Sequence, residues 1–134
     1  GEYVLLAEDG GFFNRFEDSA YIMKGKFWVN NHAHILVGKE NLITNYFLLY
    51  WLIYDDISKY VSGSTRQKLT QKIMNNILIP LPSLSEQKEI ADILQTIDQK
   101  IEIEQRKKSL YEELFKTVLN KIMNQEIDVE KIEI

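Results

Sequence analysis

The chain has 134 residues, of which 45% are apolar and 27% are charged, and its formal net charge is −4. This composition is typical of a folded, water-soluble domain; it excludes a disordered chain and disfavours a broadly electrostatic nucleic-acid binder. The lack of cysteine excludes disulfides and thiolate metal sites. No signal peptide is visible, and the longest apolar run, residues 46–54, is too short to cross a bilayer, so we expect a cytoplasmic protein.

The first forty residues carry the signals of β-strands and turns. Short apolar runs rich in β-branched and aromatic residues alternate with Gly and Asn, which mark turns. The predicted strands are residues 3–7, 21–23, 26–29 and 32–37, with an acidic turn at residues 8–11. The first part of the chain is therefore predicted to be β-rich.

The next segment changes to a helical period. Within residues 41–61, apolar side chains recur every three or four residues, and the many aromatic residues indicate a well-buried helix. The sequence SGST at residues 62–65 ends this pattern. Residues 69–74 are predicted to form one or two helical turns, and residues 77–79 a last strand.

A sharp boundary then precedes a long helix. Pro80 and Pro82 stop the preceding segment, because proline lacks an N–H donor and favours extended backbone before it. Ser83 and Glu86 have the spacing of a capping box. No Gly or Pro interrupts residues 86–123, and at about 1.5 Å per residue a helix of that length would span roughly 57 Å.

The long helix carries an apolar stripe with a heptad repeat. The stripe consists of Ile90, Leu94, Ile97, Ile101, Tyr111, Phe115, Val118 and Ile122, with Glu104 and Lys108 as polar breaks in its middle. The stripe packs either within its own chain or against another helix. Because the chain offers no second helix of this length, pairing with another chain, as a homodimer or with a second helix of the same kind, is favoured.

These elements predict an α+β fold with three parts. Residues 1–82 form a small β-rich module with one buried helix, and residues 83–124 form one long α-helix as a coiled-coil arm. Residues 125–134 form a tail that is either a short strand or frayed.

Basic side chains gather in a part of the chain that has no acids. Residues 57–85 contain no Asp or Glu but four cations, Lys59, Arg66, Lys68 and Lys72, so a polyanion would bind near them. The polar loop within this stretch consists of Ser64, Thr65, Arg66, Gln67 and Lys68. Arg, Gln and Lys can read base edges, and Ser and Thr can hold phosphates. The alternative is an ordinary solvated connection.

The two histidines are the strongest metal candidates. Strand alternation would place His32 and His34 on one face, but a zinc site needs a third ligand and the chain has no cysteine. Asn30, Asn31 and His32 either close a turn or contact a ligand. The adjacent acids at residues 8–9 and 55–56 point apart, and no catalytic triad or phosphate-binding loop is present, so no enzymatic activity is predicted.

Several motifs together resemble the DNA specificity subunit of type I restriction–modification systems. Residues 79–90, IPLPSLSEQKEI, are similar to the family's junction between a target recognition domain and a conserved helix, and residues 97–102, IDQKIE, to its continuation. Gly63-Ser64-Thr65 with Lys68-Leu69 resembles a loop late in the recognition domain, and residues 6–10 and 25–36 resemble its middle. The motifs occur in family order and cover almost the whole chain.

The resemblance implies a non-catalytic reader of double-stranded DNA. In this family a target recognition domain reads half of a split target, and a long helix pairs antiparallel with a second one to fix the spacing of the half-sites. Methyltransferase subunits dock on this scaffold and methylate adenine with S-adenosylmethionine, and a translocating restriction subunit joins them. The chain itself is therefore expected to bind no cofactor.

A full subunit has two recognition domains and two such helices, whereas this chain has one helix and the later part of one domain. We therefore expect a half-length subunit, a C-terminal fragment or a truncated gene product. Antiparallel self-pairing would restore two-fold symmetry, with attachment points up to roughly 17 base pairs apart at about 3.4 Å each. The alternative is an assembly module that pairs its helix but no longer reads DNA.

The resemblance and the polarity of the predicted loops select two sets of DNA contacts. The first set is Lys24, Trp28, Asn30, Asn31 and His32, and the second is Ser64, Thr65, Arg66, Gln67 and Lys68.

Overall fold

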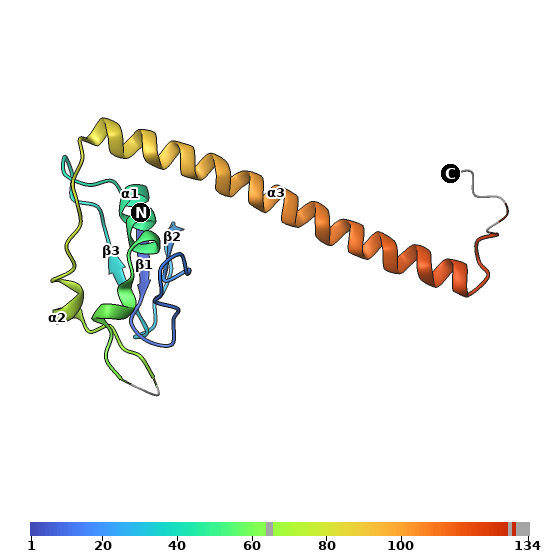
Figure 1. Cartoon of the computed structure of the whole chain (residues 1–134), viewed down its shortest axis with the longest axis horizontal. Helices are drawn as coiled ribbons and strands as arrows, with labels where there is room; N and C mark the ends of the chain where they lie inside the picture. Colours follow the sequence, from blue (N-terminus) through green and yellow to red (C-terminus); the bar gives the residue numbers. More distant parts are fainter. Residues whose placement is uncertain (64–65, 129, 131–134) are drawn as a thin grey trace. The chain divides into compact units, whose positions relative to one another are not determined.

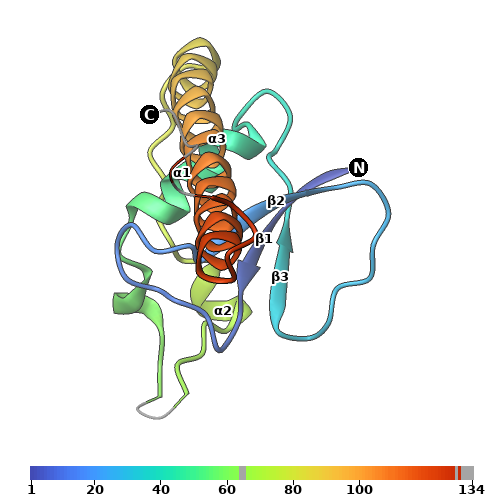
Figure 2. The same ribbon diagram turned by 90° about the vertical axis from the view of Figure 1, so that its right-hand side faces the viewer.

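The computed structural model describes residues 1–63, 66–128 and 130. The chain divides into two compact units, residues 1–94 and residues 95–134, which we describe separately. Figures 1 and 2 show the elements in chain order: β1 (Glu2–Ala7), β2 (Ala20–Lys24), β3 (Ala33–Leu36), α1 (Asn45–Tyr54), the 3-10 helix η1 (Ile57–Tyr60), α2 (Gln71–Met74) and α3 (Leu84–Met123). The predicted α+β fold is confirmed.

The first unit is built on a three-stranded sheet with the order β2-β1-β3. Both outer strands run antiparallel to β1; Glu2 pairs with Lys24 at one end, and Ala7 pairs with Ala33 at the other. Because β2 and β3 run in the same direction on either side of β1, the connection between them must return along the full length of the sheet. This geometry decides where the candidate site residues lie.

Helix α1 covers one face of the sheet (Figures 1 and 2). Alternate side chains of β1, Val4 and Leu6, are fully buried and belong to one core with three leucines of α1, Leu48, Leu49 and Leu52. Phe13, Ile57 and Leu69 complete this core from the surrounding loops. The predicted strands at residues 3–7, 21–23 and 32–37 thus correspond to β1, β2 and β3.

The helix predicted over residues 41–61 is shorter than expected. Thr44 caps its start by accepting a hydrogen bond from the backbone N–H of Phe47, and the backbone becomes extended at Asp55. Asp56 then caps η1 through its side chain. Paired aspartates favour caps over helix interiors, because their carboxylates accept bonds from nearby backbone N–H groups.

Two predicted strands are wrong. Residues 26–29 belong to the return connection between β2 and β3, where the described backbone has no strand pairing. Residues 77–79 have no strand pairing either; their alternation arises because Ile77 and Ile79 pack on the core of the unit. The short helix expected within residues 69–74 is confirmed as α2.

The first turns of α3 are fixed within the first unit. Ser83 and Glu86 form the predicted capping box: the backbone N–H of Ser83 donates to Glu86 Oε2 at 2.9 Å, and the N–H of Glu86 donates to Ser83 Oγ at 3.3 Å. The side chain of Gln87 is completely buried. It accepts from the N–H of Thr44 at 3.0 Å and donates to the carbonyls of Leu42 and Pro82 at 2.9 and 3.0 Å.

The second unit contains the remainder of α3, which ends at Met123. Its side chains are almost all exposed, including the apolar ones. None of the described helices combines the length and the hydrophobicity that a membrane-spanning segment needs.

Candidate nucleic-acid interface

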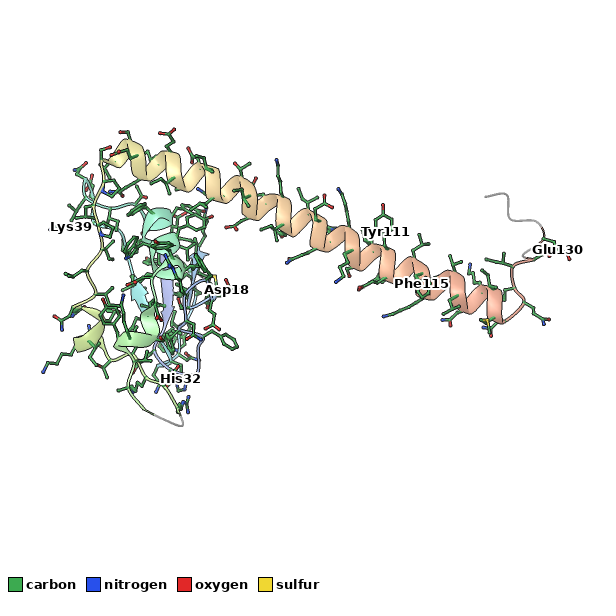
Figure 3. All side chains as sticks on the ribbon, in the orientation of Figure 1. Asp18, His32, Lys39, Tyr111, Phe115 and Glu130 are labelled. Carbon is green, nitrogen blue, oxygen red and sulfur yellow. The ribbon has the colours of Figure 1, made fainter. Side chains whose placement is uncertain are left out.

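Three segments meet at the end of the sheet where β1 finishes and β3 begins. The backbone N–H of Glu8 donates to the carbonyl of His32 at 2.9 Å, and the N–H of Leu69 donates to the carbonyl of Glu8 at 2.7 Å. Two further bonds between Ser62 and Lys68, at 2.9 and 3.1 Å, close the polar loop at its base. In Figure 3, His32 marks this end of the first unit and Lys39 the other.

Glycine is required immediately before the polar loop. Gly63 has a φ of +104°, and a Cβ there would lie 2.5 Å from the carbonyl oxygen of Arg66. Any other residue would be strained by its backbone conformation and would clash with the returning chain.

The carboxylate of Asp9 holds side chains from two of these segments. Arg66 Nη2 donates to Asp9 Oδ1 at 2.7 Å, and His32 Nδ1 lies 2.9 and 3.1 Å from the two carboxylate oxygens. The Asp9 side chain is only 11% exposed, whereas that of Arg66 is 64% exposed. The hydrogen bond from Arg66, and then that from His32, lower the pKa of Asp9.

The carboxylate of Glu8 holds Lys68, the second cation of the polar loop. Lys68 Nζ lies 2.9 Å from Glu8 Oε1. This contact lowers the pKa of Glu8 and raises that of Lys68, since each charge stabilises the other. Two carboxylates therefore offset two cations, and the site is not a broadly positive patch.

These paired charges suit recognition of specific groups on a ligand better than sequence-independent attraction to DNA phosphates. An arginine that gives one amino group to a carboxylate keeps its other N–H groups for a second acceptor, and a planar guanidinium matches the paired acceptors of a guanine edge. A locally balanced charge gives little sequence-independent attraction to phosphates. The geometry fits a reader of specific groups.

The structure separates the members of the first predicted set. His32 joins Arg66 and Lys68 around the two acids, and Asn30 supports it by accepting a bond from its backbone N–H at 3.0 Å. Lys24 lies at the opposite end of β1, where it contacts Glu2 at 3.1 Å. The pKa of Lys24 is raised, first by Tyr46 and then by Glu2.

The remaining predicted contacts differ in position. The side chain of Trp28 is 96% exposed in the connection between β2 and β3. Asn31 is exposed in the turn before β3, and Gln67 is exposed in the polar loop. Ser64 and Thr65 lie outside the described residues. Contacts between these side chains and DNA stay predictions.

The two histidines do not converge on a common ligand. His34 lies in β3, where its Nε2 is 2.7 Å from the carbonyl of Leu69, while His32 lies in the preceding turn beside Asp9. Among the described residues, no three His, Asp or Glu side chains are grouped so that they could hold a metal ion.

Sequence reasoning missed the role of Glu8 and Asp9, because it weighed them only as catalytic acids. The available signal was the pairing of an acidic strand end with an acid-free basic stretch elsewhere in the chain. Residues of opposite charge that are far apart in the sequence can form ion pairs when a sheet brings them together.

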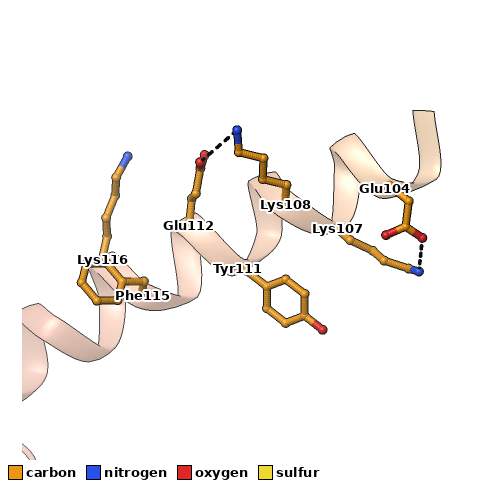
Figure 4. A pocket seen from close by; sticks show the side chains of 7 residues that line it. All are labelled: Glu104, Lys107, Lys108, Tyr111, Glu112, Phe115 and Lys116. Atoms are coloured by element: carbon orange, nitrogen blue, oxygen red, sulfur yellow. Dashed lines mark hydrogen bonds and ion pairs between the residues drawn. The ribbon is translucent and has the colours of Figure 1, made fainter. Parts of the chain in front are cut away.

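The second unit offers a different surface. Among the side chains of the predicted heptad stripe, Tyr111 is 69% and Phe115 is 67% exposed. Figure 4 shows both rings standing off the helix among charged residues, with ion pairs between Glu104 and Lys107 and between Lys108 and Glu112. Apolar rings exposed on a helix indicate a surface for another protein.

Comparison with known proteins identifies the family. The sequence profile of the type I restriction modification DNA specificity domain matches residues 1–113. The chain belongs to this family. A type I restriction enzyme specificity subunit of Haemophilus influenzae is 41% identical over 97 residues, which are 72% of this chain and 25% of that protein. The MjaVIII specificity subunit of Methanocaldococcus jannaschii is 33% identical over 100 residues, which are 72% of this chain and 24% of that protein.

Another member of the type I specificity family, the MpnII specificity subunit of Mycoplasma pneumoniae, is 31% identical over 120 residues, covering 82% of this chain and 34% of that subunit. The chain spans about a quarter of the length of the first relatives named above. No solved structure matches it. The resemblance inferred from the proline junction and the polar loop is thus confirmed.

Proposed function

We propose that this chain serves as a sequence-specific DNA-recognition subunit, or part of one, in a type I restriction–modification system. The observation that carries the proposal is the exposed Arg66 side chain, whose guanidinium donates to the nearly buried Asp9 beside the Lys68–Glu8 pair. Family membership supports double-stranded DNA as the ligand. Arg66 would contact base edges, while Lys68 and His32 would contact phosphates and fix the register.

In this role the chain is non-catalytic and binds one half of a bipartite target. Its partners would be a methyltransferase subunit and a restriction subunit, and S-adenosylmethionine would bind to the methyltransferase. Helix α3 would pair with a second helix of the same kind. Family membership supports the methyltransferase and restriction subunits as partners.

The test begins with duplexes selected on the wild-type chain from a random double-stranded library. Arg66→Ala with Lys68→Ala should weaken binding to a selected duplex by at least about tenfold, because one base contact and one phosphate contact are lost. The matched control is Lys39→Ala with Lys88→Ala, which removes the same charge from two exposed positions, Lys39 at the opposite end of the first unit in Figure 3 and Lys88 in the first turns of α3. Equal binding by both variants would remove the loop from the interface.

A second candidate function is an assembly module that pairs helices but does not read DNA. The exposed apolar side chains of α3 favour it. Such a chain would show only weak, salt-sensitive binding, and selection from a random library would yield no common sequence. Enrichment of one sequence motif would reject this alternative.

A further inference from the structure

The imidazole ring of His32 is held at one nitrogen and available at the other. Its Nδ1 lies 2.9 and 3.1 Å from the two carboxylate oxygens of Asp9. The His32 side chain is 47% exposed, whereas that of Asp9 is 11% exposed. Among the described residues, no hydrogen bond or ion pair involves the second ring nitrogen of His32, Nε2. A ligand at this end of the sheet can therefore contact Nε2.

The carboxylate of Asp9 decides which nitrogen carries the proton of the neutral ring. An ionised carboxylate only accepts hydrogen bonds, so the nitrogen beside it must donate. The hydrogen bond from Arg66 lowers the pKa of Asp9, which keeps this carboxylate ionised at neutral pH. The neutral His32 ring therefore has its proton on Nδ1 and a lone pair on Nε2. Only the imidazolium, which carries both protons, can donate from Nε2.

The ionisation of His32 sets the net charge of the candidate interface. Around the ring, the described charged and titratable side chains are Glu8 and Asp9 after β1, Arg66 and Lys68 in the polar loop, and His34 in β3. The two carboxylates offset the two cations. His34 contacts a backbone carbonyl at 2.7 Å, and this contact needs no charge on its ring. The interface therefore has no net charge while both rings are neutral, and it gains one positive charge when His32 takes up a proton.

We propose that His32 binds a DNA phosphate as an imidazolium, so that DNA binding takes up one proton from the solvent. In the complex, Nδ1–H donates to Asp9 and Nε2–H donates to a phosphate oxygen, which are two charge-assisted hydrogen bonds on opposite sides of one ring. A neutral ring would turn its lone pair towards the phosphate, and two acceptors repel each other. The carboxylate and the phosphate both stabilise the charged form of the ring.

Charge balance favours a phosphate over a base as the ligand of His32. Phosphate contacts supply most of the sequence-independent affinity of a protein for DNA, and they come from cations. Arg66 and Lys68 are each paired with a carboxylate. The imidazolium adds a positive charge beyond these two pairs, on a side chain that is about half exposed. The alternative is a neutral His32 that accepts a hydrogen bond from the amino group of adenine or cytosine, and protonation would abolish that contact.

This inference rests on the proposed function, because it states how the same site binds DNA. A wild-type chain that selects no common sequence from the random library would reject sequence recognition. The binding experiments below use a duplex that the wild type has already selected, and the last experiment contains no DNA. Failure of the inference and failure of the proposed function are therefore separate results.

The pH dependence of affinity tests the proton uptake. Between pH 8 and pH 6 the affinity of the wild type should rise about tenfold at constant salt, since imidazole ordinarily changes charge in this range. Selected and random duplexes should gain the same factor, because a phosphate contact carries no sequence information. His32→Gln keeps a polar side chain that cannot take up the proton, so its affinity should not change with pH. His34 is present in both chains, so its own titration affects both equally.

An affinity that falls as the pH falls would show that the neutral ring accepts from a base, and it would overturn the proposal. An affinity of the wild type that is as insensitive to pH as that of His32→Gln would overturn it too.

The salt dependence of binding tests whether the ligand of the imidazolium is a phosphate. Each neutralised phosphate adds about 0.9 to the slope of the logarithm of affinity against the logarithm of salt concentration. The slope of the wild type should therefore be steeper by about 0.9 at pH 6 than at pH 8, while His32→Gln should have one slope at both. An affinity that depends on pH with an unchanged slope would overturn the phosphate assignment.

Nitrogen-15 NMR of the free chain tests the fixed proton position without DNA. At pH 8 the ring of His32 should carry its proton on Nδ1, because Asp9 accepts from it at 2.9 Å. Asp9→Ala should remove this preference, whereas Asp18→Ala, which removes an exposed carboxylate, should keep it. A wild-type ring with its proton on Nε2 would overturn the proposal, because a neutral ring could then donate to a phosphate without taking up a proton.

Discussion

Asp9 connects residues that are far apart in the sequence, and this defines its role. Its carboxylate contacts Arg66 and His32 while remaining nearly buried, so it acts as a positioning residue rather than a DNA contact. Asp9→Ala should leave Arg66 in place but remove the carboxylate that positions its guanidinium. We expect the ratio of affinity for selected DNA over random DNA to fall roughly tenfold, because a misplaced guanidinium loses base readout before phosphate attraction.

The matched control for this change is Asp18→Ala, which removes an equal charge from an exposed position. Competition binding against random duplex measures the ratio for both variants. If Asp9→Ala and Asp18→Ala change it equally, then Asp9 contributes only its charge and does not position the loop.

The same acids predict a dependence of stability on pH. Glu8 and Asp9 have pKa values lowered in the folded chain by Lys68 and Arg66, so protons bind more readily to the unfolded state. The stability they contribute is present above about pH 5 and is lost as the pH falls through their folded pKa values. The variant Glu8→Gln with Asp9→Asn should therefore lose less stability than wild type between about pH 5 and 3. Thermal unfolding across this range measures the difference, and equal slopes would contradict it.

At the scale of residues, the sequence indicated the cations of the candidate site but not the carboxylates that hold them. Arg66 and Lys68 were visible as a basic stretch without acids, whereas their partners lie nearly sixty positions earlier in the chain. The structure separates Lys24 from His32, because residues close in sequence flank a connection that runs from one end of the sheet to the other. Only strand order reveals that separation.

At the scale of elements, Gln87 fastens the start of α3 to the segment before α1. Its buried amide satisfies the N–H of Thr44 and the carbonyls of Leu42 and Pro82. Gln87→Ala should lower the free energy of unfolding by about 1–3 kcal/mol, because buried backbone groups lose their partners. The control is Gln105→Ala on the exposed stretch of α3, which should cost less than about 0.5 kcal/mol. Urea denaturation measures both variants. If Gln87→Ala unfolds at the same urea midpoint as Gln105→Ala, then Gln87 does not fasten the helix.

Elements with strong local signals were predicted well. Pro80, Pro82, Ser83 and Glu86 place the start of α3, since proline punctuation and a capping box act through local hydrogen bonds. The end of α1 was missed because Ile57 continues the helical period past Tyr54, while Asp55 and Asp56 break it through capping. Residues 77–79 imitate a strand because packing on a core also selects alternate side chains.

At the scale of the whole molecule, DNA recognition and helix pairing together predict bivalent binding. Two paired copies would present two recognition units, and binding of the first half-site raises the effective concentration of the second by a factor that depends on their separation. A duplex with two inverted copies of the selected half-site should therefore bind the wild type about a hundredfold more tightly than a duplex with one copy, at a preferred separation. Ile97→Asp, which places a charge in the exposed apolar stripe of α3 without touching the first unit, should bind both duplexes equally. A preference for two half-sites that survives this substitution would mean that the copies are joined through some surface other than α3.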